Sequence, residues 1–135
     1  MVQYYEEKNE QSVLRASLLD SEARKKAESL KKGGMTSAQL RRFYGEVKNL
    51  EKKATDNETG EISEQKFLTV LPMVKMMKSK VAYANNPSNK KVPDEFREWM
   101  DEHLDSIESH RDFRAFLLHF EAVVGFCYGL GLKNN

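Results

Sequence analysis

The residue types that most often carry catalysis or bind metals are few in this chain and far apart. It has three histidines and one cysteine, His103, His110, His119 and Cys127. A structural zinc site needs about four such ligands, and no histidine here follows a glutamate by three positions, as helical di-iron sites require. His119 and Cys127 lie in an apolar stretch, so we interpret them as core residues. The sequence therefore predicts no metal, no cofactor and no catalytic residue.

Acidic residues gather between Asp94 and Glu108, where seven carboxylates occur in fifteen positions. A pair of them could serve as general acid and base in a hydrolase. Their spacing around Phe96, Leu104 and Ile107 is instead typical of the solvent-exposed face of an amphipathic helix. We therefore interpret the protein as a non-enzyme.

The net charge of +1 conceals an uneven distribution. Residues 1–91 contain 18 Lys and Arg against 12 Asp and Glu, an excess of six positive charges. Residues 92–135 contain 4 against 9, an excess of five negative charges. A basic region of this kind attracts polyanions, although a row of lysines is often only the solvated face of a helix.

Seven of the basic residues lie off the apolar stripes of two predicted helices and are expected to point outward. They are Arg41, Arg42, Lys48, Lys52, Lys75, Lys78 and Lys80. Long cations in rows bind phosphates without reading bases, so these residues are our candidates for RNA contact. An alternative stays equally open on the residues alone. In it the chain is a helical protein–protein adaptor whose basic face meets an acidic partner, without direct RNA contact.

The clearest predicted element is a helix from Ser37 to Ala54. Gly33 and Gly34 end the segment before it, and Thr36 with Gln39 three positions later forms a capping-box pattern. Leu40, Phe43, Val47 and Leu50 then recur at helical spacing. This helix should carry four of the seven candidates on its outer side.

The other apolar stripes predict a compact all-α bundle of five or six helices. A second stripe begins after Ser63, and Pro72 within it predicts a kink or a break. A further helix begins near Pro93. The last, roughly Arg111 to Leu130, is apolar on most sides and belongs in the middle. We expect residues 1–34 to form a loosely docked or mobile helical extension, residues 35–135 to form the bundle domain, and no segment to show the alternation of a strand.

The sequence favours a cytoplasmic protein. The single cysteine cannot form an internal disulfide, which suits a reducing compartment. The longest apolar stretch, from Ala115 to Tyr128, is interrupted by His119 and Glu121, so we expect no membrane span. The first residues lack the basic flank and apolar run of a secretory signal.

Three stretches resemble the small subunit of type III-A CRISPR effector complexes, the Csm complexes. The segment Met35–Tyr44, continuing through Val47, resembles that family's opening helix. Leu71–Ala84 is similar to its leucine-proline helix that ends at an aromatic residue, and Phe113–Phe126 is similar to its closing helix. The resemblance covers roughly residues 35–131, and the first 34 residues and the loop Asn85–Lys91 have no counterpart.

The resemblance implies a five- or six-helix bundle without catalytic activity, stacked in several copies along guide RNA and target RNA beside other subunits. The carried-over candidates for RNA contact are Arg41, Arg42, Lys75, Lys78 and Lys80. Lys48 and Lys52 follow from helix geometry alone. A bundle that stacks should leave apolar surface uncovered when isolated, so we also expect it to associate with copies of itself, as in a dimer.

Overall fold

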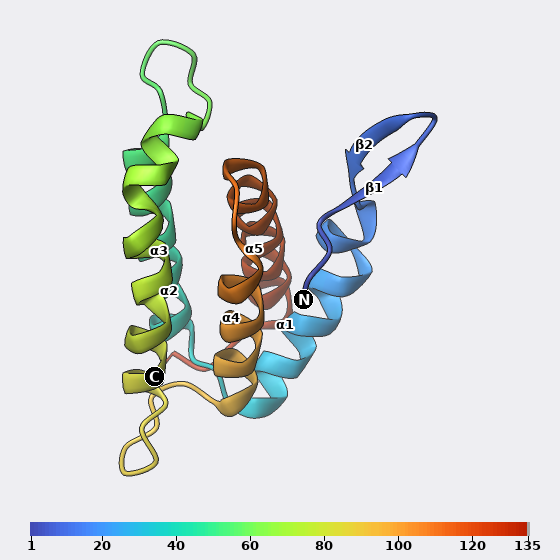
Figure 1. Cartoon of the computed structure of the whole chain (residues 1–135). Coiled ribbons are helices and arrows are strands. Elements are labelled where there is room, and N and C mark those ends of the chain that lie inside the picture. The colour runs from blue at the N-terminus through green and yellow to red at the C-terminus, as the bar shows by residue number, and fades with distance from the viewer. Residues whose placement is uncertain (135) are drawn as a thin grey trace.

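The computed structural model describes residues 1–134 and shows a helical bundle with a small β-hairpin at its N-terminal end (Figure 1). The elements are β1 (Tyr5–Lys8), β2 (Gln11–Leu14), a short 3-10 helix η1 (Ala16–Leu19), α1 (Ser21–Gly33), α2 (Ser37–Ala54), α3 (Glu64–Ala84), α4 (Asp94–Ser106) and α5 (His110–Leu130). The expected all-α bundle of five or six helices is confirmed with five. The hairpin was not expected, and the prediction that no segment forms a strand is wrong.

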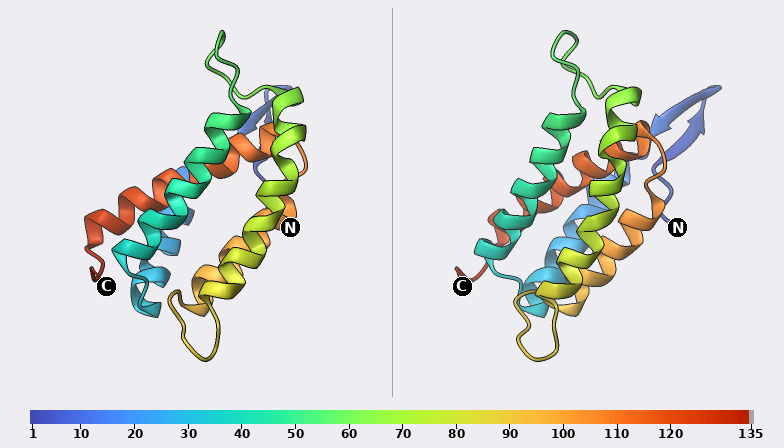
Figure 2. Two further views of the ribbon diagram at one scale, coloured as in Figure 1. Left: turned by 90° about the vertical axis from the view of Figure 1, so that its left-hand side faces the viewer. Right: turned by 60° about the vertical axis from the view of Figure 1, so that its left-hand side comes forward.

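The five helices close into a ring around one core. The last helix, α5, packs along α1 on one side and α2 on the other. From α2 the ring continues to α3, then to α4, and α4 returns to α1 (Figures 1 and 2). Nine residues of α5 are buried, as its apolar character predicted, but the helix forms one side of the ring and does not lie in its middle. Helices far apart in the sequence are thus neighbours in space.

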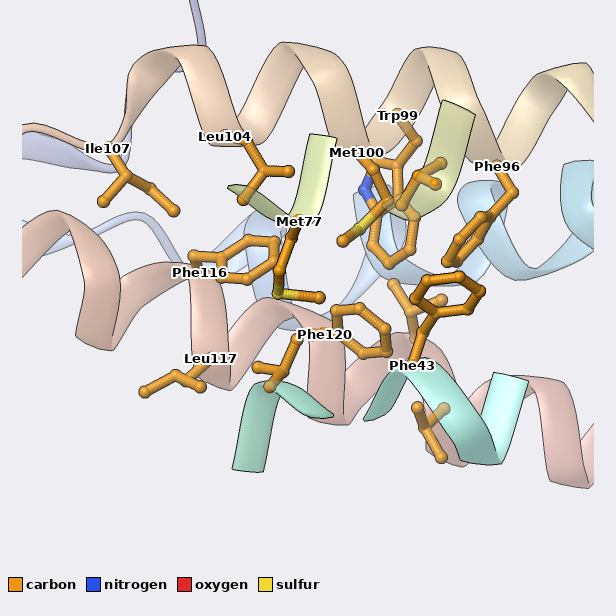
Figure 3. Packing of buried hydrophobic residues seen from close by; sticks show 14 of the residues in the cluster. Phe43, Met77, Phe96, Trp99, Met100, Leu104, Ile107, Phe116, Leu117 and Phe120 are labelled. Atoms are coloured by element: carbon orange, nitrogen blue, oxygen red, sulfur yellow. The ribbon is translucent and has the colours of Figure 1, made fainter. Parts of the chain in front are cut away.

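Aromatic side chains from α2, α4 and α5 meet inside this ring (Figure 3). The ring of Phe43 lies 5.2 Å from that of Phe96, and the ring of Trp99 lies 5.0 Å from that of Phe120, measured between centroids. These tilted arrangements are the ones that aromatic pairs prefer. Burial of such large side chains supplies most of the hydrophobic stabilisation of the bundle.

Local signals set the ends of α2 as predicted, from Ser37 to Ala54. Gly34 has a φ of 94°, the left-handed conformation that ends α1. The Thr36 hydroxyl accepts a hydrogen bond of 3.2 Å from the Gln39 amide. The Gln39 side chain does not complete the box, and its Oε1 is buried without a hydrogen-bond partner. The complete capping box is instead at the start of α5, between Ser109 and Asp112.

Of the predicted kink or break near Pro72, the break is wrong, because α3 runs without interruption from Glu64 to Ala84. Proline removes the amide that would bond to the carbonyl of Leu68, four positions earlier. Pro72 and Leu68 are both exposed, so water can solvate the freed carbonyl. The stripe of buried residues on the opposite side, from Phe67 to Val81, stays in register across the proline.

The N-terminal 34 residues are attached more tightly than the sequence suggested. Ala23, Ala27 and Leu30 of α1 are completely buried in the same core as the other helices, so the interpretation of a loosely docked helix is wrong. Before α1 the chain forms the hairpin, whose turn residues Asn9 and Glu10 both have positive φ. The division into an extension over residues 1–34 and a bundle domain over residues 35–135 stays a prediction.

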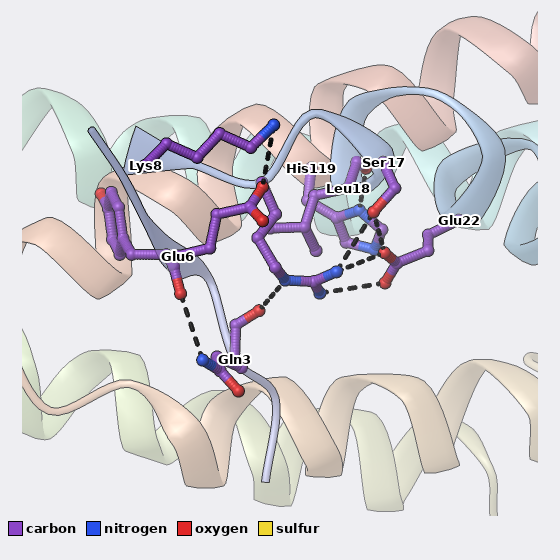
Figure 4. A network of polar contacts seen from close by, with 9 residues as sticks. Gln3, Glu6, Lys8, Ser17, Leu18, Glu22 and His119 are labelled. Carbon is purple, nitrogen blue, oxygen red and sulfur yellow. Dashed lines mark hydrogen bonds and ion pairs between the residues drawn. The ribbon is translucent and has the colours of Figure 1, made fainter. Parts of the chain in front are cut away.

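A polar network fixes the segment between the hairpin and α1 (Figure 4). Arg15 donates to both carboxylate oxygens of Glu22, at 2.7 and 3.2 Å, and to the carbonyl of Gln3 at 2.6 Å. The Ser17 hydroxyl also donates to Glu22. The Arg15 guanidinium, which donates the first bond, lowers the pKa of the Glu22 carboxyl. This network joins the residues before and after the hairpin to the first turn of α1.

His103 and His119 lie buried beneath this segment. Their rings are stacked, with centroids 4.7 Å apart. The indole N–H of Trp99 donates to Nε2 of His119 at 3.1 Å. Nδ1 of His119 therefore carries the proton and donates to the carbonyl of Leu18 at 2.6 Å. The hydroxyl of Tyr4 lies 2.8 Å from Nδ1 of His103. The interpretation of His119 as a core residue is confirmed.

These histidines should make the stability of the protein depend on pH. Burial lowers the pKa of His103 to about 3 and also lowers that of His119. Well above pH 6.5 both histidines are neutral in the folded and in the unfolded chain. Below pH 6.5 the histidines of the unfolded chain bind protons, while the buried ones of the folded chain do not. The free energy of unfolding should therefore fall as the pH drops below 6.5, by up to about 1.4 kcal/mol per pH unit for each buried neutral histidine, and for His103 the fall should continue toward pH 3.

Urea unfolding between pH 7.5 and pH 5 measures this slope. His119→Gln removes one buried titrating group and should make the slope shallower. His110→Gln, which replaces the histidine at the start of α5, is the matched control. An unchanged slope in His119→Gln would contradict the assignment of a buried neutral histidine.

Candidate nucleic-acid interface

Three of the seven candidate cations form a stripe along one side of α2. Arg41, Lys48 and Lys52 are seven and four positions apart, so helical periodicity places them on one face. All three are exposed, while Leu40 and Phe43 point into the core. The stripe is about 16 Å long at the rise of an α-helix. We call Arg41, Lys48 and Lys52 the α2 stripe.

Carboxylates of α2 and α5 modulate the charge of this stripe. Lys48 lies 2.6 Å from Oε1 of Glu51, and this hydrogen bond raises the pKa of the lysine. Tyr44 lies between the stripe and α5, where its hydroxyl donates to Glu121 at 3.1 Å. Burial, followed by the charge of Glu121, raises the pKa of Tyr44. Arg41 and Lys52 have no carboxylate within ion-pair distance among the described residues.

Arg42 lies on a different side of α2. It shares a face with Glu46, four positions later, and its guanidinium lies over the ring of Phe43 at 5.1 Å from the centroid. On this side α2 packs against α3, and Lys80 of α3 lies 3.5 Å from Glu46. The structure therefore separates Arg42 and Lys80 from the α2 stripe.

The other two candidates on α3 face α4. The ammonium of Lys75 donates to the carbonyls of Leu104 and Ile107 at 2.5 and 2.8 Å. These carbonyls belong to the last turn of α4, where no amide follows to bond them. Lys78 forms an ion pair with Asp105, and this hydrogen bond raises the pKa of the lysine. The seven candidates do not form one continuous track.

A second gathering of cations, not predicted from the sequence, lies near the start of α2. Lys90, Lys91 and Lys133 surround an open hollow of about 490 Å³ at the start of α2. Lys90 is paired with Asp94 at 2.8 Å. The only local signal was the acid-free run from Lys66 to Lys91, and nothing in the sequence placed the C-terminal lysine beside it.

The residues that could have supported catalysis are engaged in the core. His103 and His119 form the buried pair, and burial raises the pKa of the Cys127 thiol to about 11. A thiol that stays protonated at neutral pH is a poor nucleophile. Within residues 1–134 no group of three or more His, Cys, Asp or Glu side chains is arranged to hold a metal ion.

The chain matches the model of a known protein family. The family model described as Csm2 Type III-A matches residues 14–128, which is most of the sequence. The chain belongs to this family. A search of curated proteins and a search of solved structures found no match. The resemblance noted in the sequence is thereby confirmed, but the expectation that residues 1–34 and the loop Asn85–Lys91 have no counterpart is wrong for residues 14–34 and for the loop, which lie within the match.

Membership of the Csm2 family makes the protein a small subunit of a type III-A CRISPR effector complex, associated with other Csm subunits. The match includes all of α1 to α4 and all but the last two residues of α5. It begins at Leu14, so β1 and the hairpin turn lie outside the Csm2 match. By length and composition α5 could cross a membrane. Half of its most apolar stretch is buried inside the bundle, however, as is usual for the core helix of a bundle.

The bond between Lys75 and α4 gives a prediction about stability. Lys75→Met keeps the apolar stem and removes the ammonium that satisfies two carbonyls. We expect the free energy of unfolding to fall by about 1–3 kcal/mol. The matched control is Lys78→Met, which removes an exposed ion pair from the same face of α3 and should cost much less. Equal effects in urea unfolding would contradict a structural role for Lys75.

Proposed function

We propose that this Csm2-family subunit binds RNA by backbone contacts through the α2 stripe, and that several copies stack along guide RNA and target RNA. The observation that carries the proposal is the row of exposed cations at Arg41, Lys48 and Lys52 on a rigid helix. A row of this kind neutralises successive phosphates and does not read base sequence. Its role is to position RNA, without a catalytic step or a cofactor, in a cytoplasmic complex.

The remaining candidates are suited to this role to different degrees. Lys78 and Lys80 are held by carboxylates at the surface, where an ion pair is weak and a phosphate can replace the carboxylate. Arg42 is exposed and retains free donors for a second row of contacts. Lys75 is the least suited, because its ammonium already bonds two carbonyls of α4.

A helical adaptor without direct RNA contact is the second candidate function. It is favoured by one observation, that Lys48, Lys78 and Lys80 already bind carboxylates within the chain. The same cations could bind the carboxylates of another protein. The salt dependence of RNA binding separates the two candidates.

Charge reversal in the α2 stripe tests RNA binding directly. Arg41→Glu with Lys52→Glu should weaken binding of a 30-nucleotide single-stranded RNA in filter assays at increasing salt. Each lost phosphate contact should reduce the slope of log K against log salt by about 0.7. The matched control is Lys25→Glu with Lys32→Glu on α1, which changes the net charge equally. An equal loss in the control would show that only total charge matters and would contradict the α2 stripe.

The proposed stacking gives a further expectation for the isolated protein. Large apolar side chains such as Tyr83, Tyr128 and Leu130 are exposed in the single chain. We expect their burial between copies to produce self-association that increases with concentration. Light scattering measures the mass, and a monomer that persists at high concentration would contradict this expectation.

A further inference from the structure

Apolar side chains are uncovered along the outer face of α3. Leu68, Met73, Met76 and Tyr83 are exposed by 57%, 48%, 56% and 75%. The other exposed large apolar side chains of residues 1–134 lie at the N-terminus and near the end of α5. A single helix therefore contributes most of the uncovered apolar surface, which is typical of an interaction site.

Two of these side chains form the floor of a groove between α2 and α3, two neighbouring helices that lie together on one side of the molecule (Figure 2). A hollow of about 240 Å³ is lined by Met73 and Met76 from α3 and by Asn49 and Lys53 from α2. A second hollow, of about 280 Å³, shares Met73 and Lys53 with the first. The two hollows therefore form one groove along the seam, which we call the α2–α3 groove.

The rim of the α2–α3 groove is mainly basic. Lys53, Lys66 and Lys80 line it, against a single carboxylate, Glu46. Oε1 of Glu46 lies 3.5 Å from Lys80, while its Oε2 is buried without a hydrogen-bond partner. The groove thus offers an apolar floor and three cations to an incoming chain.

We propose that the α2–α3 groove docks an acidic amphipathic helix from another protein subunit of the complex. The apolar side chains of that helix, at spacings of three, four and seven residues, would rest on Met73 and Met76. Its carboxylates would pair with Lys53 and Lys66. A third helix in the seam between two helices packs at about 8–10 Å from each axis, the normal distance between packed helices. This proposal goes beyond the RNA contact and does not depend on it.

The chemistry of the groove favours a helix over RNA. Unpaired bases bind to aromatic platforms, and neither hollow of the groove is lined by an aromatic side chain. Methionine is flexible and polarizable, so it adapts to the apolar side chains of a partner helix. The negative charge of Glu46 would repel a phosphate. The α2 stripe, on a different side of α2, leaves the groove free for a second partner.

Methionine oxidation in the assembled complex measures whether the groove is covered. Met73 and Met76 should be oxidised by dilute peroxide at least about tenfold more slowly in the complex than in the isolated chain, because oxidation follows exposure. Met77 is 2% exposed and provides an internal reference that should stay slow in both samples. Equal oxidation of Met76 in the two samples would overturn the proposal.

Photocrosslinking identifies what covers the groove. Benzoylphenylalanine in place of Met76 is activated in the purified complex, and the crosslinked peptide is identified by mass spectrometry. A crosslink to a helical, acidic segment of another subunit supports the proposal. A crosslink to RNA, to a second copy of this chain or to a basic or extended segment overturns it.

Paired substitutions test whether the groove contributes to assembly. Met73→Ser with Met76→Ser alters exposed positions, so the fold should persist, and the share of subunit retained in the complex should fall at least about tenfold. Leu68→Ser, on the same helix and outside both hollows, is the matched control. Retention equal to that of the control would count against the proposal, and binding of single-stranded RNA by the isolated chain should not change.

Discussion

The packing of α5 between α1 and α2 is the constraint on which the rest of the structure depends. Phe116 and Phe120 of this helix are completely buried, and their neighbours come from α2 and α4. Because these large side chains of α5 fill the core, the remaining helices must each turn an apolar stripe inward and a charged face outward. The outward faces of α2 and α3, where the proposed contacts lie, are therefore fixed by core packing and not by the charges themselves.

Internal carboxylates divide the basic residues into groups with different availability. The ammonium of Lys75 bonds the end of α4, and Lys78 and Lys80 each meet a carboxylate of a neighbouring helix. Arg41 and Lys52 remain without such a partner among the described residues. An excess of positive charge in the sequence thus becomes a short row on one helix, because part of that charge holds the bundle together.

Features set by neighbouring residues could be predicted from the sequence, and features set by distant ones could not. The bounds of α2 follow from Gly34 and Thr36, which act within one turn, and the apolar character of α5 indicated that much of this helix is buried. The break expected at Pro72 was wrong, because the effect of a proline on a helix depends on whether the carbonyl left without a donor, here that of Leu68, faces water. The hairpin escaped notice because its turn, Asn9-Glu10, lacks the glycine that commonly marks such a turn.

The roles of individual candidates had the same limit. That Arg41, Lys48 and Lys52 share a face follows from helical periodicity, so this part of the site was accessible. The contact between Lys75 and Leu104 spans 29 positions and depends on how α3 and α4 pack. The α2–α3 groove likewise exists only once the two helices are side by side. The exposure of Met73 and Met76 could not be predicted, because methionine in a sequence more often indicates a core residue.

The attachment of the N-terminal segment has a consequence for the order of folding. The amide of Val2 donates to Ser106, 104 positions away, and Tyr4 meets His103 across 99 positions. Contacts this distant in sequence close late, because the intervening chain must first be ordered. During synthesis on the ribosome, the first helix would leave the exit tunnel long before its partner α5 exists. The packing of α1 can therefore be completed only after α5 has been synthesised.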